Sequence, residues 1–464
     1  MPLFTPPTVS PPIKPLGIFA SLKAVRQNAL NIIPEIAYTQ PIVTGETGIR
    51  RWHMVQGPEG LKQIFLDNVE NYPKSEVVLR MLRPAVGDSL FTSEGKQWRW
   101  QRSAIAPVFT ARNVNTLAPI MTETARRTTT RLKASSGPTE LVREMLSATF
   151  DVICEVALSG RDHFDSKAYS AAITQYFMTI GRTSLLDFLE TPAWIPRPAE
   201  LFGANSVKTM HNMVAKAIAA RQNQPQKNDS TIADDLLDYM LKAEDQETGR
   251  RMNQKDLLHN LQFFIVAGHE TTAIALAWAL YLCANDQTIQ TQAREEARSV
   301  LGGRDAGIED IKQAPLIEQI LLESMRLYPP VGFLARKARG PDRLYDRDVK
   351  KGDTVLLNLY GLHRHQDLWD HPAAFYPAHF APEAVKKRHR FQYVPFGGGP
   401  RICVGANFAM MQAQIILMTL LSKFRFWPTK AAAPAPVMQM TIRPEPGITL
   451  EIEDLSNPAT KLAQ

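Results

Sequence analysis

The only cysteine near the C-terminal end of the chain, Cys403, lies in a segment rich in glycine. Residues 396–405 read FGGGPRICVG, with three glycines before the cysteine and Gly405 shortly after it. Arg401 stands two residues before the sulfur, and a long apolar stretch follows at 406–421. A buried structural cysteine needs none of these neighbours, whereas a bound thiolate benefits from backbone N–H groups and a nearby cation. The segment therefore indicates a sulfur that has a bound partner.

A second candidate for chemistry is a polar interruption in the apolar stretch 261–284. The stretch is long enough to span a membrane, but placing Glu270 at mid-bilayer depth would cost roughly 2–3 kcal/mol. We therefore expect a buried helix through the middle of the protein. Gly268 permits close approach to its backbone, and Thr271 either bonds back to a carbonyl one turn earlier or offers its hydroxyl to a cavity. A buried glutamate often marks chemistry, although a salt-bridged helix defect without a catalytic role explains the pattern equally well.

Glu323 and Arg326 lie three residues apart in LIEQILLESMRLYPP, a predicted helix that the two prolines at its end would stop. Residues at this spacing share one helix face and can form an ion pair. Apolar residues on both sides predict that the pair is partly buried, and a buried pair needs further partners for its remaining donors and acceptors. We expect it to fix a loop rather than to catalyse.

These residues must be positioned by a mainly helical protein with a minor β region. The chain has 464 residues, of which 44% are hydrophobic and 21% are charged, as in ordinary globular proteins. Apolar residues recur at helical spacing in five segments and alternate as in strands in three. The predicted helices are 140–160, 205–221, 255–284, 286–300 and 314–327, and the predicted strands are 42–56, 353–359 and 438–452.

The termini, charge and cysteine content suggest one large domain in the cytoplasm. Residues 1–40 are predicted to be a proline-rich arm, extended over the surface at its start, and 41–464 to be the domain. The start of the chain lacks the apolar core of a signal peptide. Three cysteines are too few and too far apart for a disulfide framework, and Cys154 and Cys283 are expected in the core. The net charge of +7 describes either a solvated basic surface or a face that docks an acidic partner.

Four motifs together resemble those of the cytochrome P450 family. FGGGPRICVG resembles its haem-binding loop, with Cys403 in the position of the thiolate ligand. AGHETT (267–272) is similar to the oxygen-activation motif and ESMR (323–326) to the Glu-x-x-Arg motif. WRWQR (98–102) is similar to the element that contacts a haem propionate. The order and spacing of the motifs agree with the family from about residue 40 onwards.

The resemblance implies a single large helical domain of the P450 fold around a buried heme b (iron protoporphyrin IX). Cys403 would be its axial ligand, and the glycines of the loop would let the backbone pass close to the flat macrocycle. A thiolate ligand favours O–O cleavage at haem iron. Glu270 and Thr271 would relay protons to the dioxygen. The other residues implied in cofactor binding, four of them at the propionates, are Trp98, Arg102, Arg336, Arg401, Phe396 and Gly405.

The implied reaction is that of a monooxygenase (EC 1.14 type), which inserts one atom of O2 into an apolar small-molecule substrate. Electrons would come from a ferredoxin- or flavodoxin-type donor with its reductase. The basic run KKRHR (386–390) is either part of a docking face for that acidic donor or a solvated loop. No nucleic-acid partner and no membrane span are expected. By resemblance, apolar residues line the substrate pocket, and they are Phe177, Met178, Leu186, Phe188, Phe263, Phe264, Val331, Phe333 and Met440.

Two departures from the family's pattern involve histidines. His379 stands where an arginine that bonds to Glu323 and Arg326 is usual, although the imidazole could still donate one of those bonds. His363 and His365, spaced one apart, allow a zinc interpretation, but they match a structural segment of the family. His269 is expected to line its helix rather than to bind a metal.

Other functions remain open on the sequence. A peroxide-using peroxygenase or a haem-thiolate isomerase would have the same fold and cysteine, but both usually lack the acid–threonine pair that this chain keeps. A non-enzymatic haem sensor or carrier would not need that pair. A helical protein without haem is the remaining alternative, and a visible spectrum would exclude it.

Overall fold

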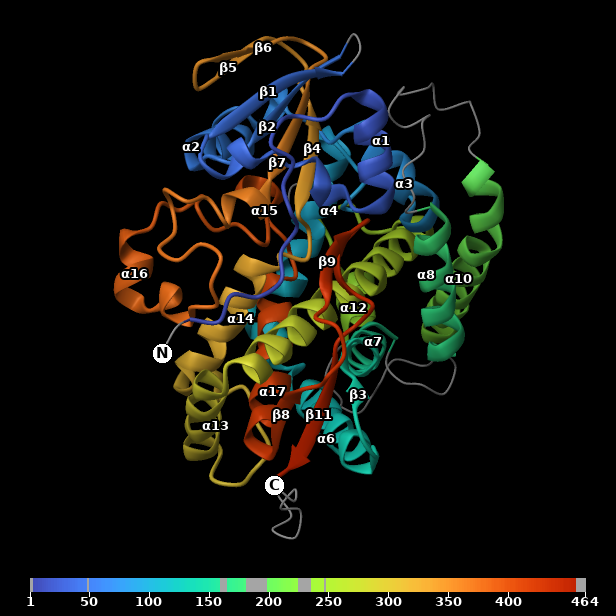
Figure 1. Cartoon of the computed structure of the whole chain (residues 1–464). Helices are drawn as coiled ribbons and strands as arrows, with labels where there is room; N and C mark the ends of the chain where they lie inside the picture. Colours follow the sequence, from blue (N-terminus) through green and yellow to red (C-terminus); the bar gives the residue numbers. More distant parts are fainter. Residues whose placement is uncertain are drawn as a thin grey trace.

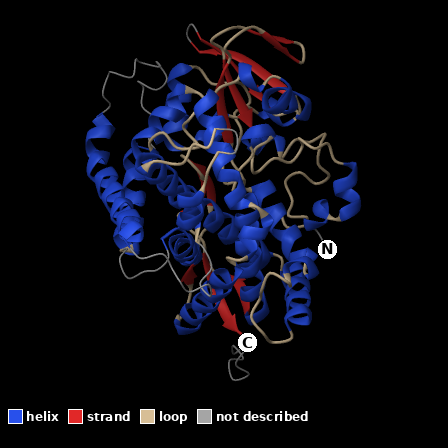
Figure 2. Cartoon of the chain, turned by 180° about the vertical axis from the view of Figure 1, so that it is seen from behind, coloured by secondary structure: helices blue, strands red, loops and turns tan. Residues whose placement is uncertain are grey.

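The computed structural model describes residues 3–47, 50–158, 165–180, 198–223, 235–245 and 248–455. Helices form most of the molecule, and short strands gather mainly at two ends (Figures 1 and 2). This confirms the predicted fold class, and all five predicted helices are present. The helices are α1 Ile18–Gln27, α2 Pro58–Lys62, α3 Glu76–Val86, α4 Gly95–Ile105, α5 Ala111–Asn115, α6 Ala118–Ala134, α7 Leu141–Leu158, α8 Ser166–Ile180, α10 Pro198–Asn223, α11 Leu236–Lys242, α12 Gln254–Asn285, α13 Gln287–Leu301, α14 Pro315–Leu327, α15 Leu359–Leu362, α16 Pro382–Lys387 and α17 Ala406–Lys423.

The strands form one four-stranded sheet and three smaller units. In the larger sheet the order is β1-β2-β7-β4, and only the β2–β7 pair is parallel. This sheet joins the early strands to a segment 302 residues later, at the top of the molecule in Figure 1. The smaller units are β3-β11-β8, β9-β10 and β5-β6. The strands are β1 Ile42–Thr47, β2 Arg50–Val55, β3 Thr139–Glu140, β4 Phe333–Lys337, β5 Asp342–Leu344, β6 Arg347–Val349, β7 Thr354–Asn358, β8 Phe424–Pro428, β9 Ala435–Met438, β10 Ile442–Glu445 and β11 Thr449–Asp454.

The long apolar helix predicted at 255–284 is α12, which runs through the middle of the molecule (Figure 1). It begins with a capping box in which Asn253 and Asp256 each accept a hydrogen bond from the other's backbone N–H. It packs against α7, α14 and α17. α12 is long and apolar enough to cross a membrane, but 78% of its most apolar window is buried inside the protein. It is therefore the core helix expected from the sequence.

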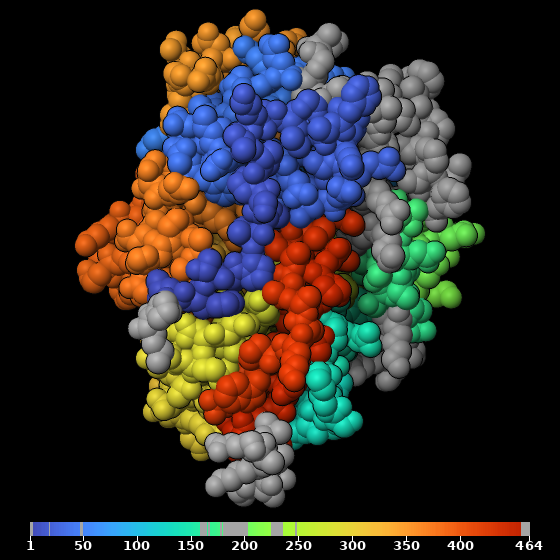
Figure 3. Space-filling view, viewed as in Figure 1, coloured from blue at the N-terminus to red at the C-terminus, as the bar shows by residue number. Residues whose placement is uncertain are grey.

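The N-terminal segment follows the surface without helix or strand until α1 begins at Ile18. The carbonyl of Pro7 accepts from the Tyr328 hydroxyl at 2.7 Å, and the carbonyl of Phe4 accepts from the N–H of Phe375 at 2.8 Å. Figure 3 shows this segment, in dark blue, crossing one face of the molecule. The division into an arm at 1–40 and a domain at 41–464 stays a prediction.

Candidate functional site

Cys403 lies in the loop between a short helical turn, Gly399–Arg401, and α17. Its backbone N–H donates to the carbonyl of Phe396 at 2.9 Å, which closes the loop. Gly405 caps the N-terminus of α17, and its N–H donates to the Cys403 sulfur. A helix N-terminus carries positive potential, so the local backbone stabilises negative charge on this sulfur.

Two of the glycines before Cys403 have backbone conformations that favour glycine, and one of them is also required by packing within the protein. Gly399 has a φ of +64°, a conformation that favours glycine. A Cβ at this position would lie 1.8 Å from the backbone oxygen of Phe65. Gly397 also has a positive φ, of +75°. The sequence interpretation assigned these glycines to close approach of a macrocycle, and the structure adds a close approach of the loop to the segment around Phe65.

The Cys403 side chain keeps an exposed surface, whereas Cys154 and Cys283 are buried as predicted. Protein atoms around the Cys403 thiol still desolvate it, and this burial raises its pKa. The hydrogen bond from Gly405 and the positive charge of Arg102 lower the pKa but do not outweigh burial. The chain by itself therefore favours the thiol, and a metal ion would be the group that removes its proton.

Trp98, Arg102 and Arg401 lie together next to the Cys403 loop. Arg102 donates to the carbonyl of Ile402 at 3.1 Å and so ties α4 to the loop. The Arg401 guanidinium lies 4.3 Å from the centre of the Trp98 ring, within the range of a cation–π contact. Arg401 also pairs with Glu94. Three residues predicted to bind propionates are thus near one another.

Arg336 joins this group, together with Lys74, which the sequence interpretation missed. A β-bridge pairs Lys74 with Arg336, and both side chains are buried. Burial and then the charge of Arg401 lower the pKa of Lys74 to about 7 and that of Arg336 to about 10. Glu94 is the carboxylate that contacts both Lys74 and Arg401. Positive charge therefore exceeds negative charge beside Cys403, and this excess fits a haem with its two propionates.

Glu270 is buried at the centre of α12 and is bound to two residues of the C-terminal strand region. Its Oε1 accepts from Nε of Arg443 at 2.6 Å and from the hydroxyl of Thr441. Burial raises the pKa of Glu270, but the bonds and charge of these partners outweigh burial and hold it below the usual value. Thr271 donates to the carbonyl of Ala267 at 2.9 Å, which is the first of the two alternatives that the sequence left open. Arg443 was not predicted because no local pattern links positions so far apart.

His269 and Gly268, which precede Glu270 on α12, lie against side chains of α7. His269 is buried, and the edge of its ring meets Phe150 with 4.9 Å between ring centres. Neither ring nitrogen of His269 has a hydrogen-bond partner among the described residues, and burial lowers its pKa to about 4. A Cβ at Gly268 would lie 3.4 Å from the Ile153 side chain, an ordinary contact. This helix face thus packs on α7, and His269 lines the helix as expected.

The predicted pair of Glu323 and Arg326 is fully buried, more so than expected. Arg326 donates to both carboxylate oxygens, at 2.7 and 2.8 Å, and to three backbone carbonyls in the range 363–374. Nδ1 of His379 lies 3.1 and 3.2 Å from the same two oxygens. His379 therefore occupies the place of the usual arginine, as the sequence allowed. The pair fixes a loop, which is the role predicted for it.

The zinc interpretation of His363 and His365 has no support in the structure. Nε2 of His363 accepts from the N–H of Val394 at 3.1 Å. Within the described ranges, no group of three or more His, Cys, Asp or Glu residues could hold a metal ion. These histidines serve the packing of the loop.

A group of aromatic side chains lies next to Lys74 and includes two residues of α12. Phe263 lies 5.8 Å from Phe91 and 5.3 Å from Phe264, measured between ring centres. Lys74 lies over the Phe91 ring. Phe91 was not predicted as a pocket residue. Of the predicted pocket residues, Leu186 and Phe188 lie outside the described residues, as do the side chains of Phe177 and Met178.

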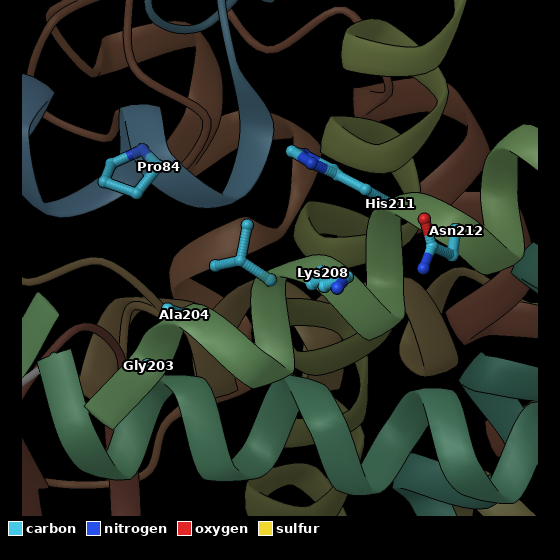
Figure 4. Close-up of a pocket in the computed structure, with 7 residues that line it drawn as sticks. Pro84, Gly203, Ala204, Lys208, His211 and Asn212 are labelled. Atoms are coloured by element: carbon cyan, nitrogen blue, oxygen red, sulfur yellow. The ribbon is translucent and has the colours of Figure 1, made fainter. Parts of the chain in front are cut away.

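A separate cavity of about 390 Å³ lies between α3 and α10 (Figure 4). Pro84, Lys208 and His211 are among the residues that line it. None of the predicted catalytic or cofactor-binding residues does so. We therefore assign the chemistry to the surroundings of Cys403 and not to this cavity.

Comparisons with known proteins show which sequences and structures this chain is similar to. The family model for Cytochrome P450 matches residues 9–452. Human Cytochrome P450 4V2 is 28% identical over 417 residues, which cover 84% of this chain and 78% of that protein. Protein LUTEIN DEFICIENT 5, chloroplastic, of Arabidopsis thaliana is 27% identical over 447 residues, covering 91% of this chain and 73% of that protein. The solved heme domain of cytochrome P450DA has a TM-score of 0.83 at 23% identity and covers 96% of this chain and 98% of its own.

Proposed function

Because the chain belongs to the cytochrome P450 family, whose members are haem-thiolate monooxygenases, we propose that Cys403 is its axial ligand and that its substrate is an apolar small molecule. The observation that carries the proposal is the cationic group at the Cys403 loop, in which Arg102 bonds to the loop and Arg401 lies near Lys74 and Arg336. When bound, the haem activates dioxygen so that one oxygen atom enters the substrate and the other leaves as water.

The residues that would hold the haem come from three parts of the chain. Arg102 and Trp98 on α4, Arg336 on β4 and Arg401 in the cysteine loop would contact the propionates. Arginine suits this role because its planar guanidinium can bind a carboxylate with two hydrogen bonds. Phe396 and Gly405 would border the ring through the loop that they close.

Glu270 and Thr271 would supply protons to the reaction. The Thr271 hydroxyl donates to Ala267 and keeps its lone pairs free to accept, so it can hold a water molecule or an oxygen atom of a ligand. Glu270 is ionised and bound to Arg443, whose side chain is 40% exposed. A proton could therefore enter from solvent at Arg443, pass Glu270 and reach the helix centre, if the ion pair opens.

The electron donor would be a ferredoxin- or flavodoxin-type protein with its reductase, and the location would be cytoplasmic. In the basic run 386–390, Lys386, Lys387 and Arg390 are exposed and could face an acidic partner, although Lys386 is paired with Glu383. Arg388 is not available, because it lies over the Trp369 ring at 4.5 Å. The docking face would thus be smaller than the sequence suggests.

The spectrum of the reduced carbon monoxide complex tests the ligand. The parent protein should show the band of a thiolate-bound haem, and Cys403→Ser should lose it while Cys154→Ser keeps it. A thiolate band in Cys403→Ser would contradict the assignment. Consumption of NADPH with a ferredoxin system, coupled to product, separates a monooxygenase from a sensor. Turnover with peroxide alone would favour a peroxygenase. Turnover without NADPH and without peroxide would favour an isomerase.

A further inference from the structure

The imidazole of His379 lies between two groups that can only accept hydrogen bonds. Its Nδ1 faces both oxygens of Glu323, at 3.1 and 3.2 Å, and its Nε2 faces the backbone carbonyl of Asp370. The ring is buried, with 6% of the residue exposed, so bulk water cannot replace either contact. This geometry is independent of the reaction proposed above.

Glu323 is ionised in this setting. Its carboxylate receives two bonds from Arg326 and one from the N–H of Tyr376 at 2.8 Å. Burial raises the pKa of Glu323, but the charge and bonds of Arg326, and then of His379, outweigh burial and lower it. An ionised carboxylate has no proton to donate, so the proton between it and His379 must belong to the imidazole.

A neutral imidazole carries one N–H and satisfies only one of these two contacts. With the proton on Nε2, the lone pair of Nδ1 would face two carboxylate oxygens. With the proton on Nδ1, the lone pair of Nε2 would face the Asp370 carbonyl. We propose that His379 is held as an imidazolium, and that its two N–H groups and positive charge make it a positioning residue in place of the family's arginine.

The charges around His379 act in both directions. Glu323, at hydrogen-bond distance, favours the imidazolium. Arg326 on the same helix opposes it, as does Arg388, which donates to the His379 carbonyl. The rings of Tyr376 and Trp369 contact the imidazole at their edges, with ring centres 5.1 and 5.3 Å away. The nearest charge is the carboxylate of Glu323, which bonds directly to the imidazole.

A short series of contacts connects this network to the cysteine loop. Arg326, oriented by Glu323, donates to the carbonyl of His363 at 2.8 Å. The ring of His363 accepts from the N–H of Val394, and the carbonyl of Val394 accepts from the N–H of Gly397 at 3.0 Å. Gly397 stands inside the loop that carries Cys403. His379 therefore acts on the ligand loop through Glu323 and Arg326.

Nuclear magnetic resonance of the haem-loaded protein labelled with ¹⁵N-histidine tests the charge directly. The His379 signals are assigned by their disappearance in His379→Gln. At about pH 7 we expect both ring nitrogens to carry a proton, as in an imidazolium. A single neutral tautomer would overturn the proposal, and this outcome does not depend on any variant's stability or on the reaction.

The positioning role is tested by the rate of haem transfer from the holoprotein to an excess of acceptor protein. The parent and His379→Arg, which keeps a cationic donor at this position, should both release haem slowly. His379→Gln should release it roughly tenfold faster than the parent. His371→Asn, at an exposed histidine in the same segment, is the matched control and should behave as the parent. Release from His379→Gln as slow as from the parent, or no rescue by His379→Arg, would overturn the role.

Discussion

Nε of Arg443 lies 2.6 Å from the Glu270 carboxylate, and this contact joins the centre of α12 to strand β10, 173 residues further along the chain. Glu270 is nearly inaccessible, whereas 40% of the Arg443 side chain is exposed. The pair therefore connects the interior of the helix to the surface. It stabilises the fold and, under the proposed function, also controls when Glu270 can take up a proton and pass it on.

Removing the cation should destabilise the protein more than removing both charges. Arg443→Gln leaves Glu270 ionised and unpaired in a buried place, and we expect a loss of about 2–3 kcal/mol in the free energy of unfolding, below the cost for a wholly buried pair because Arg443 is part exposed. The double variant Arg443→Gln with Glu270→Gln should recover part of the lost free energy of unfolding. Urea unfolding at neutral pH measures both variants.

The lowered pKa of Glu270 determines how the stabilisation by its pair with Arg443 changes with pH. The pair stabilises the protein above the ordinary pKa of a glutamate, and this contribution is lost as the pH falls through the lower folded value. The difference between parent and Arg443→Gln should therefore shrink in acid. Arg251→Gln, which breaks an exposed pair with Glu244, is the control and should change little. If Arg443→Gln and Arg251→Gln lose equal free energy of unfolding, leaving Glu270 buried and unpaired has no extra cost, which would contradict this prediction.

His269 should make the protein less stable in mild acid. The folded state keeps its ring neutral down to a pKa of about 4, while the unfolded chain takes up the proton near 6.5. Between these values the unfolded state binds more protons, so stability rises with pH. His269→Leu should reduce that rise by about 3 kcal/mol. Unfolding curves at several pH values measure it, and an unchanged slope would count against a neutral buried ring.

The motifs of the site were predictable because each is local in sequence. The Cys403 loop, the Glu323–Arg326 pair and the back-bond of Thr271, which was one of two alternatives for that hydroxyl, each depend on residues within a few positions of one another. Short-range spacing determines such contacts, since backbone geometry fixes which neighbours can meet. The main helices were predictable for the same reason, because an apolar face repeats along each one.

The partners that complete the site were not predictable, because they come from distant segments. Arg443 reaches Glu270 only after the C-terminal strands fold back along α12. Lys74 reaches Arg336 only once the segment before α3 lies beside β4. A lysine between a proline and the helix cap Ser75 gives no local sign of such an environment. Tertiary packing, and not propensity, decides these contacts.

A methyl group at Gly399 should disrupt the Cys403 loop. In Gly399→Ala the Cβ would lie 1.8 Å from the backbone of Phe65, and the residue would also keep a positive φ. We expect a loss of roughly 2–4 kcal/mol or incomplete haem loading. Gly268→Ala, where the nearest atom is 3.4 Å away, is the control and should change stability little. The absorbance ratio of haem to protein, with thermal unfolding, compares them; full loading of Gly399→Ala would contradict the packing argument.

Lys74 should lower the stability of the protein but strengthen its binding of the cofactor. Burial and the nearby charges of Arg401 and Arg336 lower its pKa to about 7, which means that the protein environment disfavours the protonated amine. A propionate would supply the missing negative charge and favour it. Lys74→Met removes the disfavoured charge but also this partner, so we expect haem release to become roughly tenfold faster at neutral pH.

The effect should depend on pH in a stated direction. Below pH 7 the parent lysine is charged and holds the propionate most firmly, and above it the amine loses its proton unless the haem retains it. The gap in release rate between parent and Lys74→Met should therefore narrow as the pH rises. Lys62→Met, at an exposed lysine paired with Asp67, controls for loss of a surface charge. If Lys74→Met and Lys62→Met release haem equally fast at every pH, Lys74 does not face the cofactor.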